Sequence, residues 1–298
     1  MSVSFAEYLE SKFDLDERSL NREVRAALMQ ALQHLPEIRC LDVGAGTGAT
    51  ARRLLAAGLA APLSVTALDR DAALLDIARA DAAARLEASG RSAFIEAGEV
   101  HAGGEPATAM RFVACELREY RPEQPCNLIT AHALLDIVPL ADTLRRFADW
   151  LEPGGYLHAS LNYDGETTLL PASVDAAFEA SLLAHYHESM ERRRVDGQAT
   201  GGAYCGRRLH GLLPEHGFDI LACGSSDWSI TPFLGQYRGR DATCLRALLD
   251  MIDAEARASG RFDPGQLGRW REDRIHCLRQ RRLGLVAHQL DMLARYDP

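Results

Sequence analysis

Long apolar runs are missing from this 298-residue sequence. None reaches the roughly 18 residues that a membrane-spanning helix needs, so we expect no membrane partner. The first twenty residues mix acids with apolar residues, and they lack the basic start and apolar centre of a secretory signal. These two absences predict a cytoplasmic protein.

Closely spaced cysteines are also missing. The sequence has seven cysteines, an odd number, and no C-x-x-C pair. This pattern disfavours a disulfide framework and a structural zinc site, and we expect buried thiols in a reducing compartment. His185 and His187 are two residues apart on a predicted helix and so face different sides, which gives no reason to expect a metal there either.

Positive charge is scarce, because 42 acids outnumber the 33 lysines and arginines and give a formal net charge of −9. Nucleic-acid affinity comes largely from basic residues that neutralise phosphates, so we expect no nucleic-acid partner. The composition is otherwise that of an ordinary globular protein, with 47% hydrophobic and 25% charged residues. We expect a monomer or a homodimer.

What the sequence does contain is an alternation of strand and helix patterns. Short apolar segments predict strands at 38–43, 63–68, 111–115, 126–131, 155–161 and 217–223. Helical spacing is found at 4–12, 19–35, 49–57, 71–88, 141–151, 173–193 and 207–216, and in the tail at 240–258, 264–280 and 282–295. Ser19 is the expected N-cap of the second helix, and 89–110 is expected to be a loop or a short hairpin. The alternation implies a mostly parallel sheet, whose ligands bind outside the carboxyl ends of the strands.

The first predicted strand ends in a glycine-rich turn, Asp42-Val43-Gly44-Ala45-Gly46-Thr47-Gly48. Glycine lets the backbone turn tightly and approach a ligand with no Cβ in the way. Read as Gly44, Gly46 and Ala49, the turn fits the dinucleotide fingerprint G-x-G-x-x-G/A, which keeps an NAD-dependent oxidoreductase as an alternative. The acid at Asp42 and the third glycine at Gly48 favour a different ligand.

Two later strands end in acids that fit an adenosyl ligand. Asp69 follows Gly48 by 21 residues, and its carboxylate can accept hydrogen bonds from both hydroxyls of a ribose. Glu116 ends the third strand and can accept from an adenine amino group, while the amide of Leu117 addresses the ring. The segment Leu151-Glu152-Pro153-Gly154-Gly155 is typical of the end of a helix followed by a turn, and it precedes the predicted fifth strand.

This ordered set resembles the class I S-adenosylmethionine-dependent methyltransferases. The segments that carry it are LDVGAGTG at 41–48, TALD at 66–69, FVACEL at 112–117 and LEPGGYL at 151–157. The resemblance implies an α/β fold with a doubly wound, mostly parallel, seven-stranded Rossmann-like sheet. It also implies a helical N-terminal lid at 1–37, a core at 38–232 and, in this chain, a C-terminal helical extension at 233–298. Tyr8, Lys12 and Arg18 of the lid are expected on its surface, with a position facing the site as the alternative.

The resemblance also implies a cofactor, S-adenosylmethionine, and a product, S-adenosylhomocysteine. Gly44, Ala45, Gly46 and Gly48 would pass under the methionine part, with Asp42 near its amino group. Asp69, followed by Arg70, would hold the ribose, and Glu116 and Leu117 the adenine. Glutamate at 116 departs mildly from the commoner aspartate. Ala131 and His132, after the fourth strand, would line the cofactor wall.

Methyl transfer needs an acceptor held in line and, for a protonated acceptor, a base. His132 is a candidate base, or only part of the cofactor wall, and Asp136 either orients it or caps the following helix. Asn162 and Asp164 follow the fifth strand, where they contact substrate or simply form a turn. Tyr186 and His187 lie on a predicted helix, where one of them can face the pocket.

These observations predict a methyltransferase that acts on a small molecule. Acids at 136, 164, 188 and 227 favour an amine nitrogen over oxygen, sulfur or carbon as the acceptor atom. Besides the NAD-dependent oxidoreductase, a non-catalytic relative that serves as a binding or scaffold protein remains open.

Overall fold

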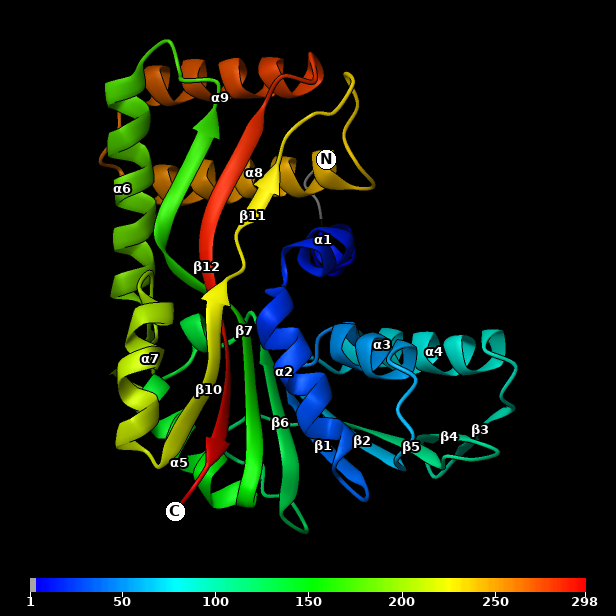
Figure 1. Cartoon of the computed structure of the whole chain (residues 1–298). Coiled ribbons are helices and arrows are strands. Elements are labelled where there is room, and N and C mark those ends of the chain that lie inside the picture. The colour runs from blue at the N-terminus through cyan, green and yellow to red at the C-terminus, as the bar shows by residue number, and fades with distance from the viewer. Residues whose placement is uncertain (1–3) are drawn as a thin grey trace.

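The computed structural model describes residues 4–298, and one large β-sheet forms its centre (Figure 1). Seven strands cross this sheet in the order β5, β2, β1, β6, β7, β12, β10. Their bounds are Thr108–Ala114, Leu63–Asp69, Ile38–Val43, Cys126–His132, Leu151–Leu170, Gly284–Tyr296 and Phe218–Ser225, respectively. The pairs from β5 to β7 are parallel, whereas β12 is antiparallel to both its neighbours. The expected α/β fold with a mostly parallel seven-stranded core is confirmed.

Three further strands enlarge the sheet. The hairpin of β3 (Ala93–Glu96) and β4 (Glu99–Ala102) adds antiparallel strands at the edge beside β5. The short strand β11 (Trp228–Ile230) pairs with β12. The stretch 89–110 is therefore the short hairpin that its turn residues allowed.

Helices cover both faces of the sheet. In chain order they are α1 (Phe5–Ser19), α2 (Arg22–Gln33), α3 (Ala49–Ala56), α4 (Ala72–Ala88), the 3-10 turn η1 (Leu135–Ile137), α5 (Leu140–Trp150), α6 (Ala176–Arg192), α7 (Cys205–Glu215), α8 (Asp241–Ser259) and α9 (Pro264–Arg279). A small hairpin of β8 (Arg194–Val195) and β9 (Gln198–Ala199) follows α6. Within residues 4–298, no helix combines the length and the apolar character that a membrane crossing requires.

The alternation of side chains along the strands supplies two apolar cores, one on each face. In β1, Leu41 and Val43 pack with residues of α5 and α7. Ile38 and Cys40 point to the other face and pack with residues of α2, α3 and α4. The sheet is thus sandwiched between two helical layers, as a parallel sheet requires.

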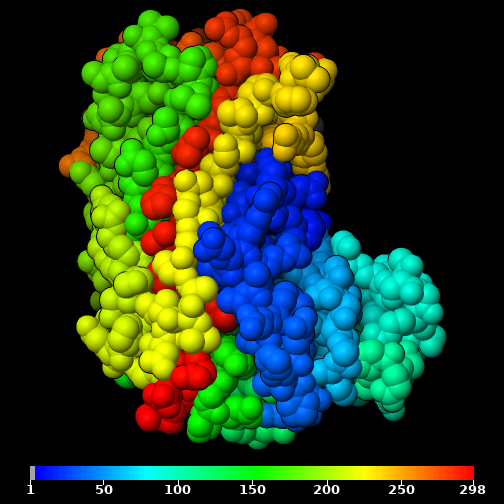
Figure 2. Space-filling model, in the orientation of Figure 1, coloured from blue at the N-terminus to red at the C-terminus, as the bar shows by residue number. Residues whose placement is uncertain are grey.

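A third core lies beyond the end of the parallel strands. It forms because β7, with 20 residues, and β12, with 13, continue past their neighbours (Figure 1). Leu169 of β7 and Leu285 of β12 pack there with buried residues of α1, α6, α8 and α9. We call this assembly the upper core. In Figure 2, α1 and α2 cross the visible face between β10 and β11 on one side and α3 and α4 on the other.

The helix expected at 282–295 is wrong, because this segment is the central strand β12. Two register shifts in its pairing with β7, between Ala287 and Gln289 and between Leu290 and Met292, break the alternation of a regular strand. The remaining apolar spacing imitates a helix. The helices expected at 240–258 and 264–280 are confirmed as α8 and α9.

The break expected between the first two helices is also misplaced. The acidic stretch 14–17 does not form a turn, because α1 continues through it to Ser19. Asn21, not Ser19, caps α2, and its side-chain oxygen accepts from the backbone N–H groups of Glu23 and Val24. The extra turns of α1 bring Asp16 to the carboxyl ends of the strands.

Candidate active site

The glycine turn after β1 has the backbone that its sequence predicts. Gly44, Gly46 and Gly48 have φ values of +71°, +53° and +87°, which L side chains rarely adopt. A Cβ on Gly48 would also lie 3.0 Å from the Cβ of Ala78 in α4. The turn leads into the N-terminus of α3, where no side chain caps the free N–H groups. Helix α1 lies over it, since Leu9 is 3.3 Å from where a Cβ of Gly46 would be.

Asp69 is joined to this turn by a hydrogen bond. The backbone N–H of Gly46 donates to Oδ2 of Asp69 at 2.8 Å, and that of Asp71 donates to Oδ1 at 2.9 Å. Each oxygen keeps one acceptor site, so a ribose diol fits the carboxylate. Asp71 serves as the N-cap of α4. Arg70 and Glu116 are exposed beside it, and Leu117 is half-buried.

Asp42 and Ala131 lie deeper than a ligand contact requires. Asp42 is buried and accepts from the Thr130 hydroxyl at 2.7 Å. Burial raises the pKa of its carboxyl to about 6. Ala45 and Ala131 are buried in the core, which leaves mainly their backbone groups for a ligand.

His132 is the centre of a polar network rather than a free base. Its Nδ1 is 2.8 Å from the Ser160 hydroxyl, and its Nε2 is 3.1 Å from a carboxylate oxygen of Asp16. An ionised carboxylate can only accept, so Nε2 carries the proton and Nδ1 accepts from Ser160. Burial and the neighbouring Arg53 lower the pKa of His132 to about 3.

Arg53 adds to the effect of burial in keeping the ring neutral. Its two terminal nitrogens each lie 3.1 Å from one ring nitrogen of His132. Since Asp16 and Ser160 occupy the in-plane directions of the ring, this spacing is that of a guanidinium stacked on its face. A cation there disfavours protonation of the imidazole. The ring is held as part of the wall between α1 and the sheet, and this geometry argues against a role as base.

Asp16 belongs to the polar network of His132 although no sequence pattern indicates it, and Lys12 lies beside it. Asp16 is 1% exposed, pairs with the Nζ of Lys12, and accepts from Nε1 of Trp228 at 3.0 Å. Its pKa falls to about 2 against the opposing effect of burial, because Lys12 and His132 favour the charged form. Lys12 is thus buried, not on the surface as expected, and Arg18 is bonded to Asp241 at 2.6 Å.

Asn162 and Asp164 are predicted after the fifth strand, but they lie inside it, because β7 continues to Leu170, and both have structural partners. Asn162 is buried, and its Nδ2 donates to the carbonyl of Leu290 at 2.9 Å. Asp164 accepts from the backbone N–H and Nε of Arg207 in α7, at 2.9 and 3.0 Å. Tyr163, between them, points to the upper core, where its hydroxyl lies 2.7 Å from Nε2 of His187.

Asp136 of η1, Tyr8 of α1 and Tyr186 of α6 lie near one another, and we call the region that they border the acceptor recess. Asp136, Tyr8 and Tyr186 remain partly accessible, although protein surrounds them closely. Burial raises the pKa of Asp136 to about 6 and raises the pKa values of both phenols. No hydrogen bond or ion pair within residues 4–298 joins these three side-chain heads to another side chain.

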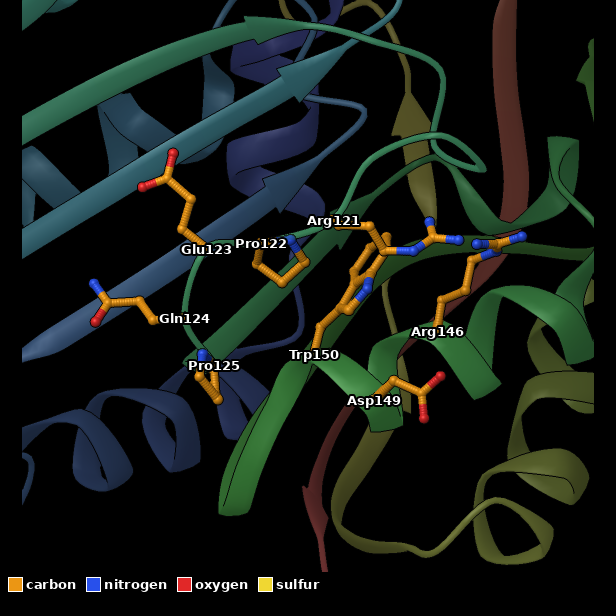
Figure 3. A pocket seen from close by; sticks show the side chains of 8 residues that line it. All are labelled: Arg121, Pro122, Glu123, Gln124, Pro125, Arg146, Asp149 and Trp150. Atoms are coloured by element: carbon orange, nitrogen blue, oxygen red, sulfur yellow. The ribbon is translucent and has the colours of Figure 1, made fainter.

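This recess adjoins the glycine turn. Leu134, two residues before Asp136, is 2.8 Å from where a Cβ of Gly44 would lie. A different recess, of about 300 Å³, lies at the amino ends of the strands between the β5–β6 loop and α5 (Figure 3). Arg121, Arg146, Asp149 and Trp150 are among its lining residues. Among the described residues, no group of three or more His, Cys, Asp or Glu is arranged to hold a metal ion.

Comparison with known proteins assigns the fold to a family. Residues 17–222 match the family model described as a methyltransferase domain, whereas no curated protein matches the chain. A protein from Bacillus halodurans described as a methyltransferase superposes with a TM-score of 0.52 at 16% identity, over 92% of this chain and 98% of that one. An S-adenosylmethionine-dependent methyltransferase from Thiobacillus denitrificans, solved with S-adenosylhomocysteine, gives a TM-score of 0.47 at 15% identity, over 99% and 100%. Since the family model spans more than half of the chain, the protein belongs to the methyltransferase domain family, and its resemblance to the class I S-adenosylmethionine-dependent methyltransferases is confirmed.

Proposed function

We propose that this protein transfers a methyl group from S-adenosylmethionine to an amine nitrogen of a small molecule. The observation that carries the amine is the acceptor recess beside the glycine turn, where one carboxylate, Asp136, lies near the phenols of Tyr8 and Tyr186. A carboxylate pairs with an ammonium group, and tyrosine faces attract one. A phenol or thiol acceptor gains neither interaction.

The residues around the turn fit the cofactor. The free acceptor sites of Asp69 suit the ribose hydroxyls, and the exposed Glu116 with the Leu117 amide suits an adenine edge. The positive φ of Gly44 and Gly46 lets bare backbone face the methionine part. When bound there, S-adenosylmethionine supplies an electrophilic methyl group on a sulfonium.

The recess then orients the acceptor. The Asp136 carboxylate accepts a hydrogen bond from the amine and holds the nitrogen near Leu134, on the side of the glycine turn. An ammonium ion must lose a proton before its nitrogen can attack. With its pKa raised to about 6, Asp136 is ionised at pH 7 and more basic than an exposed aspartate, so it takes up that proton at a carboxylate oxygen.

The other candidates receive supporting roles. His132 holds α1 against the end of β6 through Asp16. Asn162 and Asp164 hold β7 against β12 and α7. His187 orients the Tyr163 hydroxyl in the upper core. Tyr186 contacts the acceptor directly, and Tyr8 closes the recess from the lid.

The test combines a binding and a transfer measurement. Isothermal titration with S-adenosylhomocysteine should give binding to the wild type and to D136N, but not to D69A. Transfer of a labelled methyl group to a panel of small amines, phenols, carboxylates and thiols should occur on amines and be impaired in D136N. D149N, which removes an exposed acid at the opposite end of the strands, is the matched control and should behave as the wild type.

Two outcomes would contradict the proposal. Absence of S-adenosylhomocysteine binding by the wild type would refute the cofactor assignment. Transfer confined to phenols, thiols or carboxylates, or to a nucleic acid or protein, would refute the small-amine acceptor while leaving the cofactor in place.

A reducing, cytoplasmic location is part of the proposal. All seven cysteines are free thiols, and Cys40, Cys126, Cys205, Cys244 and Cys277 are buried. Such thiols persist in a reducing compartment.

A further inference from the structure

Arg193 is an unpaired cation at the rim of the acceptor recess. It directly follows α6, and its side chain is exposed. Its neighbours are engaged, since Arg192 pairs with Glu188 and Glu255, and Arg194 donates to the carbonyl of Glu191. Among the described residues, no carboxylate pairs with the guanidinium of Arg193.

The backbone holds Arg193 next to Asp136. After the β8–β9 hairpin the chain folds back, and the N–H of Thr200 donates to the carbonyl of Arg193 at 3.5 Å. The next residues reach η1, where the N–H of Gly202 donates to the carbonyl of Asp136 at 2.9 Å. A Cβ on Gly201 would lie 3.1 Å from the Cα of Asp136. The hairpin therefore connects the end of α6 to η1.

Arg193 lies near Asp136 without forming an ion pair with it. The arginine is the nearby cation that most lowers the pKa values of Asp136 and Tyr186, which burial raises. Tyr186 lies in the last two turns of α6, and Arg193 is the C-cap residue of the same helix. The recess thus presents an anion, a cation and a tyrosine ring to a ligand between them.

We propose that the methyl acceptor is an amino-acid-like zwitterion, whose amine binds Asp136 and whose carboxylate binds Arg193. This assignment rests on the proposed function. A guanidinium binds a carboxylate through two parallel hydrogen bonds, which sets orientation as well as affinity. A plain amine leaves Arg193 without a partner and brings a second positive charge beside it. A zwitterion, by contrast, matches a site that holds one charge of each sign.

The experiment compares amines that differ only in a carboxylate. The pairs are glycine and methylamine, leucine and 3-methylbutylamine, and phenylalanine and 2-phenylethylamine. Initial rates of methyl transfer give kcat and KM, and saturation-transfer NMR with S-adenosylhomocysteine present gives binding without turnover. We expect the carboxylated member of at least one pair to have a kcat/KM about tenfold or more above that of its partner, mostly through KM.

Variants of Arg193 separate its role from that of the site as a whole. R193M should remove the preference for the carboxylated member while leaving S-adenosylhomocysteine binding intact, and R193E should reverse the preference. R192M removes the adjacent arginine that already has acidic partners, so it should keep the wild-type preference.

Three results would overturn the zwitterion. The first is that the wild type uses the decarboxylated amines as well as or better than the carboxylated ones. The second is that R193M keeps the wild-type preference. The third is that no carboxylated amine binds in the presence of S-adenosylhomocysteine. The first two results would still be compatible with methyl transfer to an amine. The proposed function itself fails if no amine of either kind accepts a methyl group.

Discussion

Replacement of His132 by glutamine should change how the stability of the protein depends on pH. In the folded chain, burial, Arg53 and Lys12 hold the pKa of His132 at about 3, against 6.5 for an unperturbed histidine. Between these values the unfolded chain binds a proton at this residue and the folded chain does not. Stability therefore rises with pH through this window and is lost as the pH falls from about 6.5.

The size of the effect follows from the two pKa values. On moving from pH 8 to pH 5, protonation of His132 in the unfolded chain costs the fold about 2 kcal/mol. Glutamine cannot titrate, so H132Q should lack this part of the acid destabilisation, whatever its stability at pH 8. For a chain of this length the difference corresponds to about 3 °C in Tm.

Scanning calorimetry of wild type and H132Q at pH 8, 6.5 and 5 measures this difference. H210Q, which replaces an exposed histidine of α7, is the control and should follow the wild type. Ring NMR signals give a direct reading, because those of His132 should not shift between pH 8 and pH 5. Parallel Tm profiles for wild type and H132Q, or a ring that titrates near pH 6.5, would refute the stacked, neutral histidine.

Three further predictions concern the cofactor turn, the lid and the acceptor recess. S-adenosylhomocysteine at 100 times its Kd should stabilise the wild type by about 2.7 kcal/mol, and D69A should lose this shift in Tm because the ribose loses its carboxylate. W228F removes the N–H that donates to buried Asp16, so urea unfolding should show a loss of about 1–3 kcal/mol; a loss below 0.5 kcal/mol would contradict the importance of that bond. The KM for the amine should rise as the pH falls through about 6, where Asp136 becomes protonated, and this rise should be absent in D136N; identical KM profiles would count against Asp136 as the amine partner.

The parallel half of the fold could be predicted because its signals are local. Strand β1 begins and ends at the predicted residues 38 and 43, and glycine marks the turn that follows. The antiparallel strand β12 could not, because it is buried on both sides and its two register shifts remove the alternation. In the sequence, Asp291 also looks like an acidic residue on the exposed face of a helix. In the fold it is buried and accepts from the N–H groups of Asn21 and Leu161 at 2.8 and 2.7 Å.

The places of Asp69 and the glycines in the fold were predictable for the same reason, and the place of Asp16 was not. Asp69 and the glycines occur at fixed places relative to strands that the sequence reveals. Asp16 occurs in an acidic stretch that looks like a solvated surface, and its partners His132 and Trp228 are 116 and 212 residues away. Such pairings depend on the packing of α1 against the upper core, which no local pattern encodes.

The two halves of the site therefore depend on different parts of the chain. The residues that fit the cofactor follow β1, β2 and β5, whose positions the parallel sheet determines. The residues that fit the acceptor come from α1, η1 and the end of α6, and α1 and α6 are packed by the upper core that the long ends of β7 and β12 support. A change in that core can move Tyr186 and Arg193 without moving Asp69. If the proposed acceptor residues are correct, a change in the upper core alters the acceptor while the glycine turn and the cofactor stay the same.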